Sequence, residues 1–412
     1  MTGVSSSPPE PAPRNAPPGT VTEVFLVFLR LGLTSFGGPV AHLAYFREAL
    51  VERRRWVSER AYADLVALCQ FLPGPASSQV GMALGLQRAG LWGMCAAWFA
   101  FTMPSVILLV AFAYGVAGAG DLSEAGWVHG LKAAAVAVVA HAVLGMSRTL
   151  TPDAPRATIA ALTMIIVLLL PTPFILVAAI AVAGLIGLVW LKPAAETFTE
   201  GDEFRVRVSK RLAAGCLGLF ALLLAGLPLL VGLTGNAYAA LVDLFYRAGS
   251  LVFGGGHVVL PLLQAETVTT GLVEADTFLA GYGAAQAVPG PLFTFAGFLG
   301  ASTLEGPGGI PGAVIAIAAI FLPAALLVLG ALPFWEALRS HTQVRRALMG
   351  VNAGVVGILA AALYDPVFTA GVLDVGLGAL LLAIGAFTAL NSWKAPAWAV
   401  VLVAGVLGWL AL

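Results

Sequence analysis

Charged residues are scarce in this chain of 412 residues: they make up 10% of it, whereas soluble domains carry about 25%. Lys plus Arg and Asp plus Glu balance at 21 each, so no basic tract indicates nucleic-acid binding. Only three cysteines are present, Cys69, Cys95 and Cys216, and none forms a CxxC pair. We interpret them as small packing residues, which argues against a disulfide framework, a redox motif or a metal site.

Several enzyme and nucleotide signatures are also missing. The chain has no GxxxxGK[ST] loop, no HExxH and no GxSxG, and no compact acidic cluster lies within its apolar segments. Residues 1–20 are rich in proline and serine and lack the basic and apolar regions of a cleavable signal peptide. We therefore predict a disordered N-terminal tail, no cofactor and no catalytic residues.

Apolar residues, in contrast, are abundant. They form 59% of the chain, and the mean hydropathy is +0.94. Apolar runs recur along the whole length, many of them near the ~20 residues that a spanning helix needs. The composition predicts an all-α integral membrane protein whose partner is the lipid bilayer. The only other long polar stretch, residues 192–211, is expected to be a cytoplasmic linker.

The two halves of the chain resemble each other. FLRLGLTSFGGP at 28–39 aligns with FYRAGSLVFGGG at 245–256, an offset of 217 (247 minus 30), and QFLPGP at 70–75 aligns with QAVPGP at 286–291, an offset of 216 (286 minus 70). Such regular internal similarity predicts a duplication. The expected domains are a tail at 1–20, a first repeat at 21–191, a linker with a joining helix at 192–233, and a second repeat at 234–412.

The number of apolar segments predicts that the second repeat is inverted in the membrane. Each repeat holds six, and the joining segment Leu212–Leu233 adds one more, which flips the second copy. Flanking charge agrees, because loop 47–60 is rich in arginine while its counterpart 264–276 is acidic. After the third segment the difference in loop charge is reversed, because there the second half carries the basic residues Arg345 and Arg346. We expect a cytoplasmic N-terminus and a periplasmic C-terminus.

Prolines and glycines interrupt several apolar segments. Segment 61–86 begins and ends beside arginines, so it is expected to be re-entrant or broken, at Pro73-Gly74-Pro75 and, in its twin, at Pro289-Gly290-Pro291. The first segment is interrupted in the same way at Gly37, Gly38 and Pro39. Unwound backbone at membrane depth survives only when it is buried in protein or lines a wet cavity, which predicts a central polar site.

At this point the chain resembles the chromate transporter family in its long, two-domain form. The resemblance rests on SFGGPVAH with VERRRWV at 35–57, PGP at 73–75, FGGGHVVLPLL at 253–263 and QAVPGPLFTFAGFLG at 286–300. It implies a bacterial inner-membrane protein that exports chromate and confers resistance to it, with sulfate as a competing structural analogue.

A tetrahedral dianion needs fixed hydrogen-bond donors and positive charge, and two arginines are candidates for both. Arg30 and Arg247 occupy equivalent positions just before a glycine break, where an unpaired guanidinium costs about 2.5–3.5 kcal/mol or more. The alternatives are snorkelling to the interface or an internal ion pair, such as Arg247 with Asp243 one turn earlier.

The broken elements are further candidates, since half-helix N-termini favour anions. Their glycines can instead serve close helix packing, and the PGP turns can simply end helices. Two glutamines next to the PGP turns add hydrogen-bonding groups. The resulting candidates for substrate binding are Phe36, Gly37, Gly38, Pro39, Gln70, Pro73, Gly74, Pro75, Phe253, Gly254, Gly255, Gly256, Gln286, Pro289, Gly290 and Pro291.

Lys132 and Asn352 pair across the repeat, and Lys132 is a candidate third positive charge or a lysine reaching lipid headgroups. His42 and His257, and also His141, are candidates for a proton relay or for hydrogen-bonded packing residues.

Taken with the resemblance, these patterns predict a secondary anion carrier in which one repeat moves against the other to alternate access. A transporter or channel for sulfate or another oxyanion shares every feature. A membrane-embedded enzyme acting on a lipid-linked substrate is the alternative from another class. Small-residue faces fit a monomer or a homodimer equally well.

Overall fold

The computed structural model describes residues 19–118, 125–170, 172–192, 204, 206, 208–253, 259–335 and 341–412. Every regular element in these ranges is helical, which confirms the all-α fold expected from the composition. Five helices in these ranges are long and apolar enough to cross a membrane.

The first half runs from α1 to α7, and its elements are α1 (Val21–Thr34), α2 (Gly38–Phe46), the π-helical η1 (Arg47–Arg53), α3 (Glu59–Phe71), α4 (Ala76–Gly118), α5 (Gly126–Leu150), α6 (Ala154–Leu169) and α7 (Pro173–Trp190). Helix α8 (Lys210–Thr234) follows. Only 6% of its most apolar stretch is buried, so this joining helix lies at the periphery.

The second half repeats this order. Its elements are α9 (Ala237–Leu251), α10 (Val259–Thr267), α11 (Ala275–Ala287), η3 (Leu292–Thr294), α12 (Phe295–Ala301), α13 (Gly309–Ala331), η4 (Leu332–Phe334), α15 (Thr342–Ala362), η5 (Leu363–Leu373), α16 (Leu377–Asn391) and α17 (Ala397–Ala411).

Helix α4 is a helical hairpin rather than one long rod. Its chain reverses at Ala89 and Gly90, whose φ angles are −142° and +66°. The two arms are closely packed on either side of this reversal, since a Cβ placed on Gly85 would lie 2.4 Å from the carbonyl oxygen of Gly93. Only glycine allows this approach. The two arms of α4 correspond to η3 with α12 and to α13 in the second half.

Residues 61–86 fold back on themselves, as the expected re-entrant course requires. The guanidinium of Arg88, at the end of the first arm of α4, lies 5.1 Å from the ring centroid of Trp56, just before α3. In the second half the amide of Leu304, after α12, donates to the carbonyl of Leu272, just before α11, at 2.9 Å. Each segment therefore returns to the end of the bundle at which it began.

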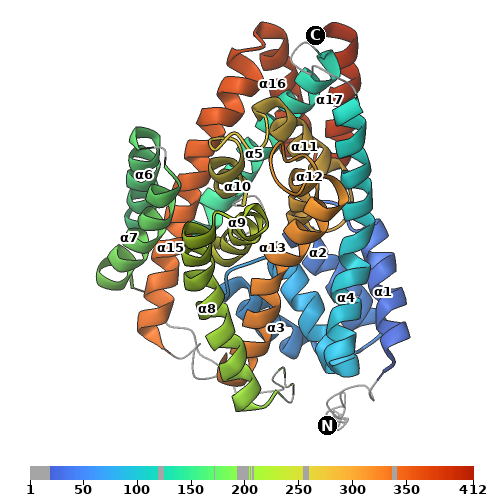
Figure 1. Cartoon of the computed structure of the whole chain (residues 1–412), viewed down its shortest axis with the longest axis vertical. Coiled ribbons are helices and arrows are strands. Elements are labelled where there is room, and N and C mark those ends of the chain that lie inside the picture. Colours follow the sequence, from blue (N-terminus) through green and yellow to red (C-terminus); the bar gives the residue numbers. More distant parts are fainter. Residues whose placement is uncertain are drawn as a thin grey trace, which may run out of the picture.

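The halves exchange their last two helices. Helices α16 and α17 pack against α5 of the first half, while α6 and α7 pack against α15 of the second (Figure 1). Small residues permit both contacts: a Cβ on Gly130 would lie 2.1 Å from the carbonyl oxygen of Ala404, and one on Gly350 would lie 2.2 Å from that of Ala183. Neither half can thus pack its own helices without the other.

The second arm of α4 and its counterpart α13 run in opposite directions. At one end the hydroxyl of Tyr114, late in α4, accepts from the amide of Ile310, at the start of α13, at 3.2 Å. At the other end Trp335, just after α13 and η4, donates to the carboxylate of Asp64 on α3 at 2.9 Å. Equivalent elements of the two halves are antiparallel at this contact.

Candidate functional site

The PGP turns break the re-entrant segments at their tips. Helix α3 ends at Phe71 and α4 begins at Ala76; between them Gly74 adopts φ +115°. In the second half Gly290 adopts φ +96° between α11 and η3. Both glycines are needed because this left-handed backbone disfavours any side chain. The prolines on either side lack amides and stop the helices.

Each PGP turn binds the break of the opposite half. The amide of Gly74 donates to the carbonyl of Val252 at 2.7 Å, and the amide of Gly290 donates to the carbonyl of Ser35 at 2.9 Å. Val252 and Ser35 precede the two glycine elements at equivalent positions of the repeat, 217 residues apart (252 minus 35). The four broken segments therefore meet in two reciprocal pairs.

The first glycine element starts a helix, as its sequence predicts. Gly37 and Gly38 have φ angles of +102° and +79°, and α2 begins at Gly38 with a proline in its first turn and no side-chain cap. Phe36 packs against the ring of Trp398 with centroids 5.7 Å apart. In the second half Phe253 is half-buried, whereas Gly254, Gly255, Gly256 and His257 lie outside the described residues.

The two symmetric arginines have different surroundings. Arg30 is exposed near the end of α1, and no ion pair in the described ranges includes it. Arg247 is held by two carboxylates, with Nε 3.0 Å from Asp243 Oδ2 and Nη1 2.9 Å from Glu266 Oε1. The internal ion pair considered for Arg247 is confirmed. A small cavity between α7, α9 and α10 reaches this group.

The repeat explains the difference. The two arginines are 217 residues apart. At the same offset, Asp243 corresponds to Leu26 in the first half (243 minus 26), and Glu266 corresponds to Ala49 (266 minus 49). Arg30 therefore lacks the carboxylates that neutralise its counterpart. Two otherwise equivalent guanidinium groups differ in the charge that they can offer a ligand.

Lys132 belongs to an ion pair between the halves. Its Nζ lies 2.6 Å from Oδ1 of Asp276 on α11, and its side chain is 5% exposed. The interpretation of a lysine reaching lipid headgroups is wrong, because an ammonium group this buried and paired does not reach the interface. Asn352, its counterpart, is half-buried on α15.

The glutamines beside the PGP turns are not equivalent either. Gln70 is exposed at the end of α3, whereas Gln286 on α11 is partly buried. A different glutamine supports the first turn, since Gln79 Nε2 donates to the carbonyl of Pro73 at 2.8 Å. The structure thus places Gln79, rather than Gln70, at this turn.

His42 is fully buried where α2 meets α4. Its Nδ1 lies 3.3 Å from the hydroxyl of Ser77, and its ring packs edge-on against Phe101 with centroids 5.4 Å apart. Sequence reasoning missed Ser77 and its neighbour Ser78, both 2% exposed. A signal for them existed, because two hydroxyl residues directly follow PGP at the start of a helix.

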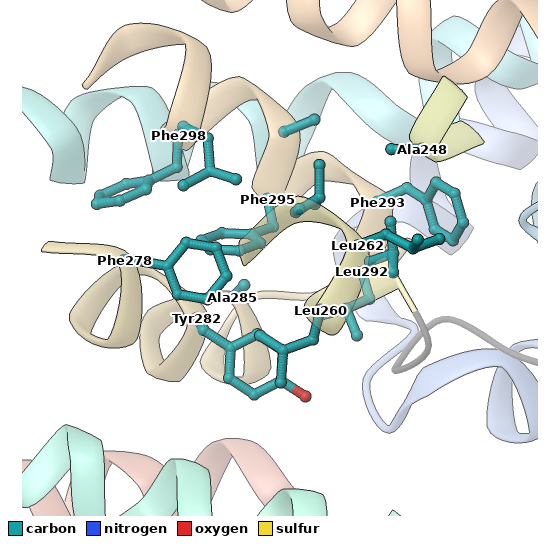
Figure 2. Packing of buried hydrophobic residues seen from close by; sticks show 14 of the residues in the cluster. Ala248, Leu260, Leu262, Phe278, Tyr282, Ala285, Leu292, Phe293, Phe295 and Phe298 are labelled. Carbon is teal, nitrogen blue, oxygen red and sulfur yellow. The ribbon is translucent and has the colours of Figure 1, made fainter. Parts of the chain in front are cut away.

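The corresponding region of the second half is aromatic. Figure 2 shows Phe295 beside Phe278, Tyr282 and Phe298, with Phe293 at the other end of the cluster near Leu262 and Leu292. The ring centroids of Phe278 and Phe295 are 5.1 Å apart, and those of Phe295 and Phe298 are 5.9 Å apart. The halves therefore share a backbone plan while differing in the chemistry of their inner surfaces.

Long apolar helices, re-entrant segments and broken helices meeting at the centre define a multi-pass integral membrane protein of the transporter type. The sequence profile of the chromate transporter family matches residues 22–188 and again 239–409. The chain belongs to this family.

Relatives of similar length support the assignment. The chromate transport protein of Pseudomonas aeruginosa is 29% identical over 408 residues, covering 96% of this chain and 93% of that protein. An uncharacterized transporter of Methanocaldococcus jannaschii is 26% identical over 403 residues, covering 97% of this chain and 96% of that protein. The chromate transport protein of Cupriavidus metallidurans is 26% identical over 356 residues, covering 84% of this chain and 82% of that protein. No solved structure matches the chain.

Proposed function

We propose that this protein exports the chromate dianion across the bacterial inner membrane as a secondary active transporter and so confers chromate resistance. The observation that carries the proposal is the meeting of broken helices in reciprocal pairs, at Gly74 with Val252 and Gly290 with Ser35, in a chain of the chromate transporter family. Broken helices give a membrane protein what an anion needs, namely backbone amides directed at the bilayer interior.

Alternating access between inverted repeats is the mechanism we propose. Its support is the repeated order of elements, the peripheral joining helix α8 and the antiparallel course of α13 and the second arm of α4. In such a carrier one repeat moves against the other around a central site. The arginine-rich loop 47–60 favours a cytoplasmic N-terminus, and inversion places the C-terminus in the periplasm.

The proposed transport leaves the substrate chemically unchanged. The chain carries no nucleotide-binding loop, so an ion gradient or the membrane potential is expected to drive export. A carrier for sulfate or another oxyanion is the nearest alternative, since tetrahedral oxyanions differ little in hydrogen-bonding geometry. A membrane-embedded enzyme would instead require chemical conversion of its substrate.

Uptake of radiolabelled chromate into inverted membrane vesicles tests the proposal. Inversion turns export into accumulation, and excess sulfate, molybdate or chloride serves as competitor. We expect saturable uptake that stops when ionophores collapse the ion gradients, with vesicles lacking the protein as the control. Uptake of a competitor but not of chromate would refute the assignment of chromate as the substrate. Chemical alteration of chromate would favour the alternative that the protein is a membrane-embedded enzyme.

A further inference from the structure

Buried hydroxyl and imidazole groups gather in the first half around the starts of α2 and α4. We define the serine–histidine cluster as Ser35, His42, Ser77, Ser78 and Thr102, each of which is 0–2% exposed. Four of its atoms have no hydrogen-bond partner in the part of the chain that the structure describes, namely Ser35 Oγ, His42 Nε2, Ser78 Oγ and Thr102 Oγ1. An unpaired buried polar group is costly, so a concentration of them indicates a polar ligand.

Contacts of His42 and Ser35 connect the cluster to the neighbouring elements. The His42 ring lies between the hydroxyl of Ser77 at 3.3 Å and the ring of Phe101, which directly precedes Thr102. The carbonyl of Ser35 accepts the amide of Gly290, so the PGP turn of the second half closes the cluster. When Nδ1 of His42 accepts the Ser77 hydroxyl, Nε2 carries the ring hydrogen.

Two helix N-termini meet the cluster. Helix α2 begins at Gly38 without a side-chain cap, four residues before His42. In α4 the carbonyl of Pro75 accepts from the amide of Gln79 at 2.9 Å, so the amides of Ala76, Ser77 and Ser78 precede the first bond of the helix. Unpaired amides and the helix dipole both favour a bound anion.

The second half does not reproduce this chemistry. At the PGP offset of 216 residues, Ser77 and Ser78 correspond to Phe293 and Thr294. Phe293 packs against Phe321 with ring centroids 6.0 Å apart, and the hydroxyl of Thr294 is already bonded to the carbonyl of Pro291 at 2.7 Å. The backbone break is therefore duplicated, whereas the two hydroxyl groups that follow the first PGP turn are replaced in the second half by a phenyl ring and by a hydroxyl that already has a partner.

We propose that the serine–histidine cluster is the single oxyanion-binding site of the protein, which rests on the proposed function of oxyanion transport. Hydroxyl, imidazole and backbone amide groups hold a tetrahedral dianion by hydrogen bonds. Arg247 does not pair with the bound anion, because Asp243 and Glu266 already neutralise its charge. In the present conformation the donors are closed to solvent, so the site opens as the halves move.

Equilibrium binding of radiolabelled sulfate and chromate to the purified protein tests this site. Ser78→Ala and Thr102→Val each remove one free donor, and we expect the Kd to rise about tenfold, as for loss of a hydrogen bond to a charged ligand. Thr294→Ala is the matched control in the second half and should change the Kd less than about twofold. The stoichiometry should be one ion per chain. Unchanged Kd in both first-half variants, or two ions per chain, would overturn the proposal.

Thermal unfolding separates a binding role from a structural one. Removing an unpaired buried hydroxyl relieves a desolvation cost, so Ser78→Ala should keep or raise the Tm while it weakens binding. A Tm that falls, with binding kept per folded molecule, would make Ser78 a packing residue and overturn its assignment. If the wild-type protein neither binds nor transports any oxyanion, the proposed function itself fails. If it transports chromate while the cluster variants bind normally, only the single-site proposal fails.

Discussion

The amide of Gly74 in the first half donates a 2.7 Å hydrogen bond to the carbonyl of Val252 in the second. The equivalent hydrogen bond runs in the other direction between the halves, from the amide of Gly290 in the second half to the carbonyl of Ser35 in the first, at 2.9 Å. These bonds connect the tip of each re-entrant segment to the broken first helix of the other half. Movement of one half against the other must therefore act directly on the breaks.

Substitution of either PGP glycine by alanine should damage the protein, and the second substitution more than the first. Both positions have positive φ, which costs about 1–2 kcal/mol for a residue with a Cβ. At Gly290 the new Cβ would also lie 2.5 Å from Ser105 Oγ, whereas at Gly74 the nearest atom, Gln79 Nε2, is 3.2 Å away. We expect Gly290→Ala to lower the Tm and transport most.

Gly215→Ala provides the matched control for the glycine variants. Gly215 lies on α8, where nothing comes within 4 Å of an added Cβ and the helical backbone accepts alanine. The Tm and chromate uptake of this variant should equal or exceed those of the wild type. Equal uptake by Gly74→Ala, Gly290→Ala and Gly215→Ala would show that the PGP turns have no part in transport.

The two symmetric arginines should respond differently to glutamine. Arg30→Gln removes a positive charge that no ion pair in the described ranges neutralises, and losing its attraction for an approaching dianion should lower chromate uptake at unchanged membrane abundance. Arg247→Gln leaves Asp243 and Glu266 without their cation, which should cost about 2–3 kcal/mol and lower abundance as well as uptake.

Neutralising the two carboxylates left without a cation tests why Arg247→Gln lowers abundance and uptake. Asp243→Asn and Glu266→Gln added to Arg247→Gln should restore abundance, because no unpaired charge then remains. Restored uptake in this triple variant would show that Arg247 acts through structure. Normal uptake by both single arginine variants would exclude the arginines from anion binding.

The ion pair between Lys132 and Asp276 should stabilise the contact between the halves. Lys132→Met and Asp276→Asn each break it, and their combination forms a double-mutant cycle measured by thermal unfolding. Since the lysine is almost fully buried, we expect a coupling free energy on the order of 1–3 kcal/mol. A coupling near zero would mean that the 2.6 Å contact contributes nothing to the association of α5 and α11.

The features predictable from sequence were local ones. A glycine or proline breaks a helix wherever it lies, so the turns at Gly37, Gly74 and Gly290 could be placed from the residue types alone. The one ion pair foreseen, Arg247 with Asp243, joins neighbours on a single helix turn. Its second partner, Glu266, lies on another helix and could not be foreseen.

Contacts between the halves could not be predicted in the same way because no periodicity encodes them. Lys132 stood out as a lysine within an apolar segment, but its partner Asp276 lies on the other repeat. The hydroxyl residues of the serine–histidine cluster were missed for a related reason, although His42 was named: hydroxyl residues in apolar helices normally bond their own backbone, as Thr294 does. Only the folded arrangement shows that Ser78 has no such bond.

Cysteine labelling tests the inverted and re-entrant course together. In a background without Cys69, Cys95 and Cys216, single cysteines replace Ser58 and Thr270, at equivalent loops of the two halves. We expect a membrane-impermeant maleimide to reach them from opposite sides of the membrane, because α13 runs antiparallel to the second arm of α4, its counterpart in the first half.

Two further positions test re-entrance within each half. Ala89→Cys should label from the same side as Ser58→Cys, since Arg88 lies against Trp56, and Glu305→Cys should label from the side of Thr270→Cys, since Leu304 bonds Leu272. Labelling of Ser58→Cys and Thr270→Cys from one side would refute inversion. Labelling of Ala89→Cys from the side opposite Ser58→Cys would instead make residues 61–86 a full crossing and refute re-entrance.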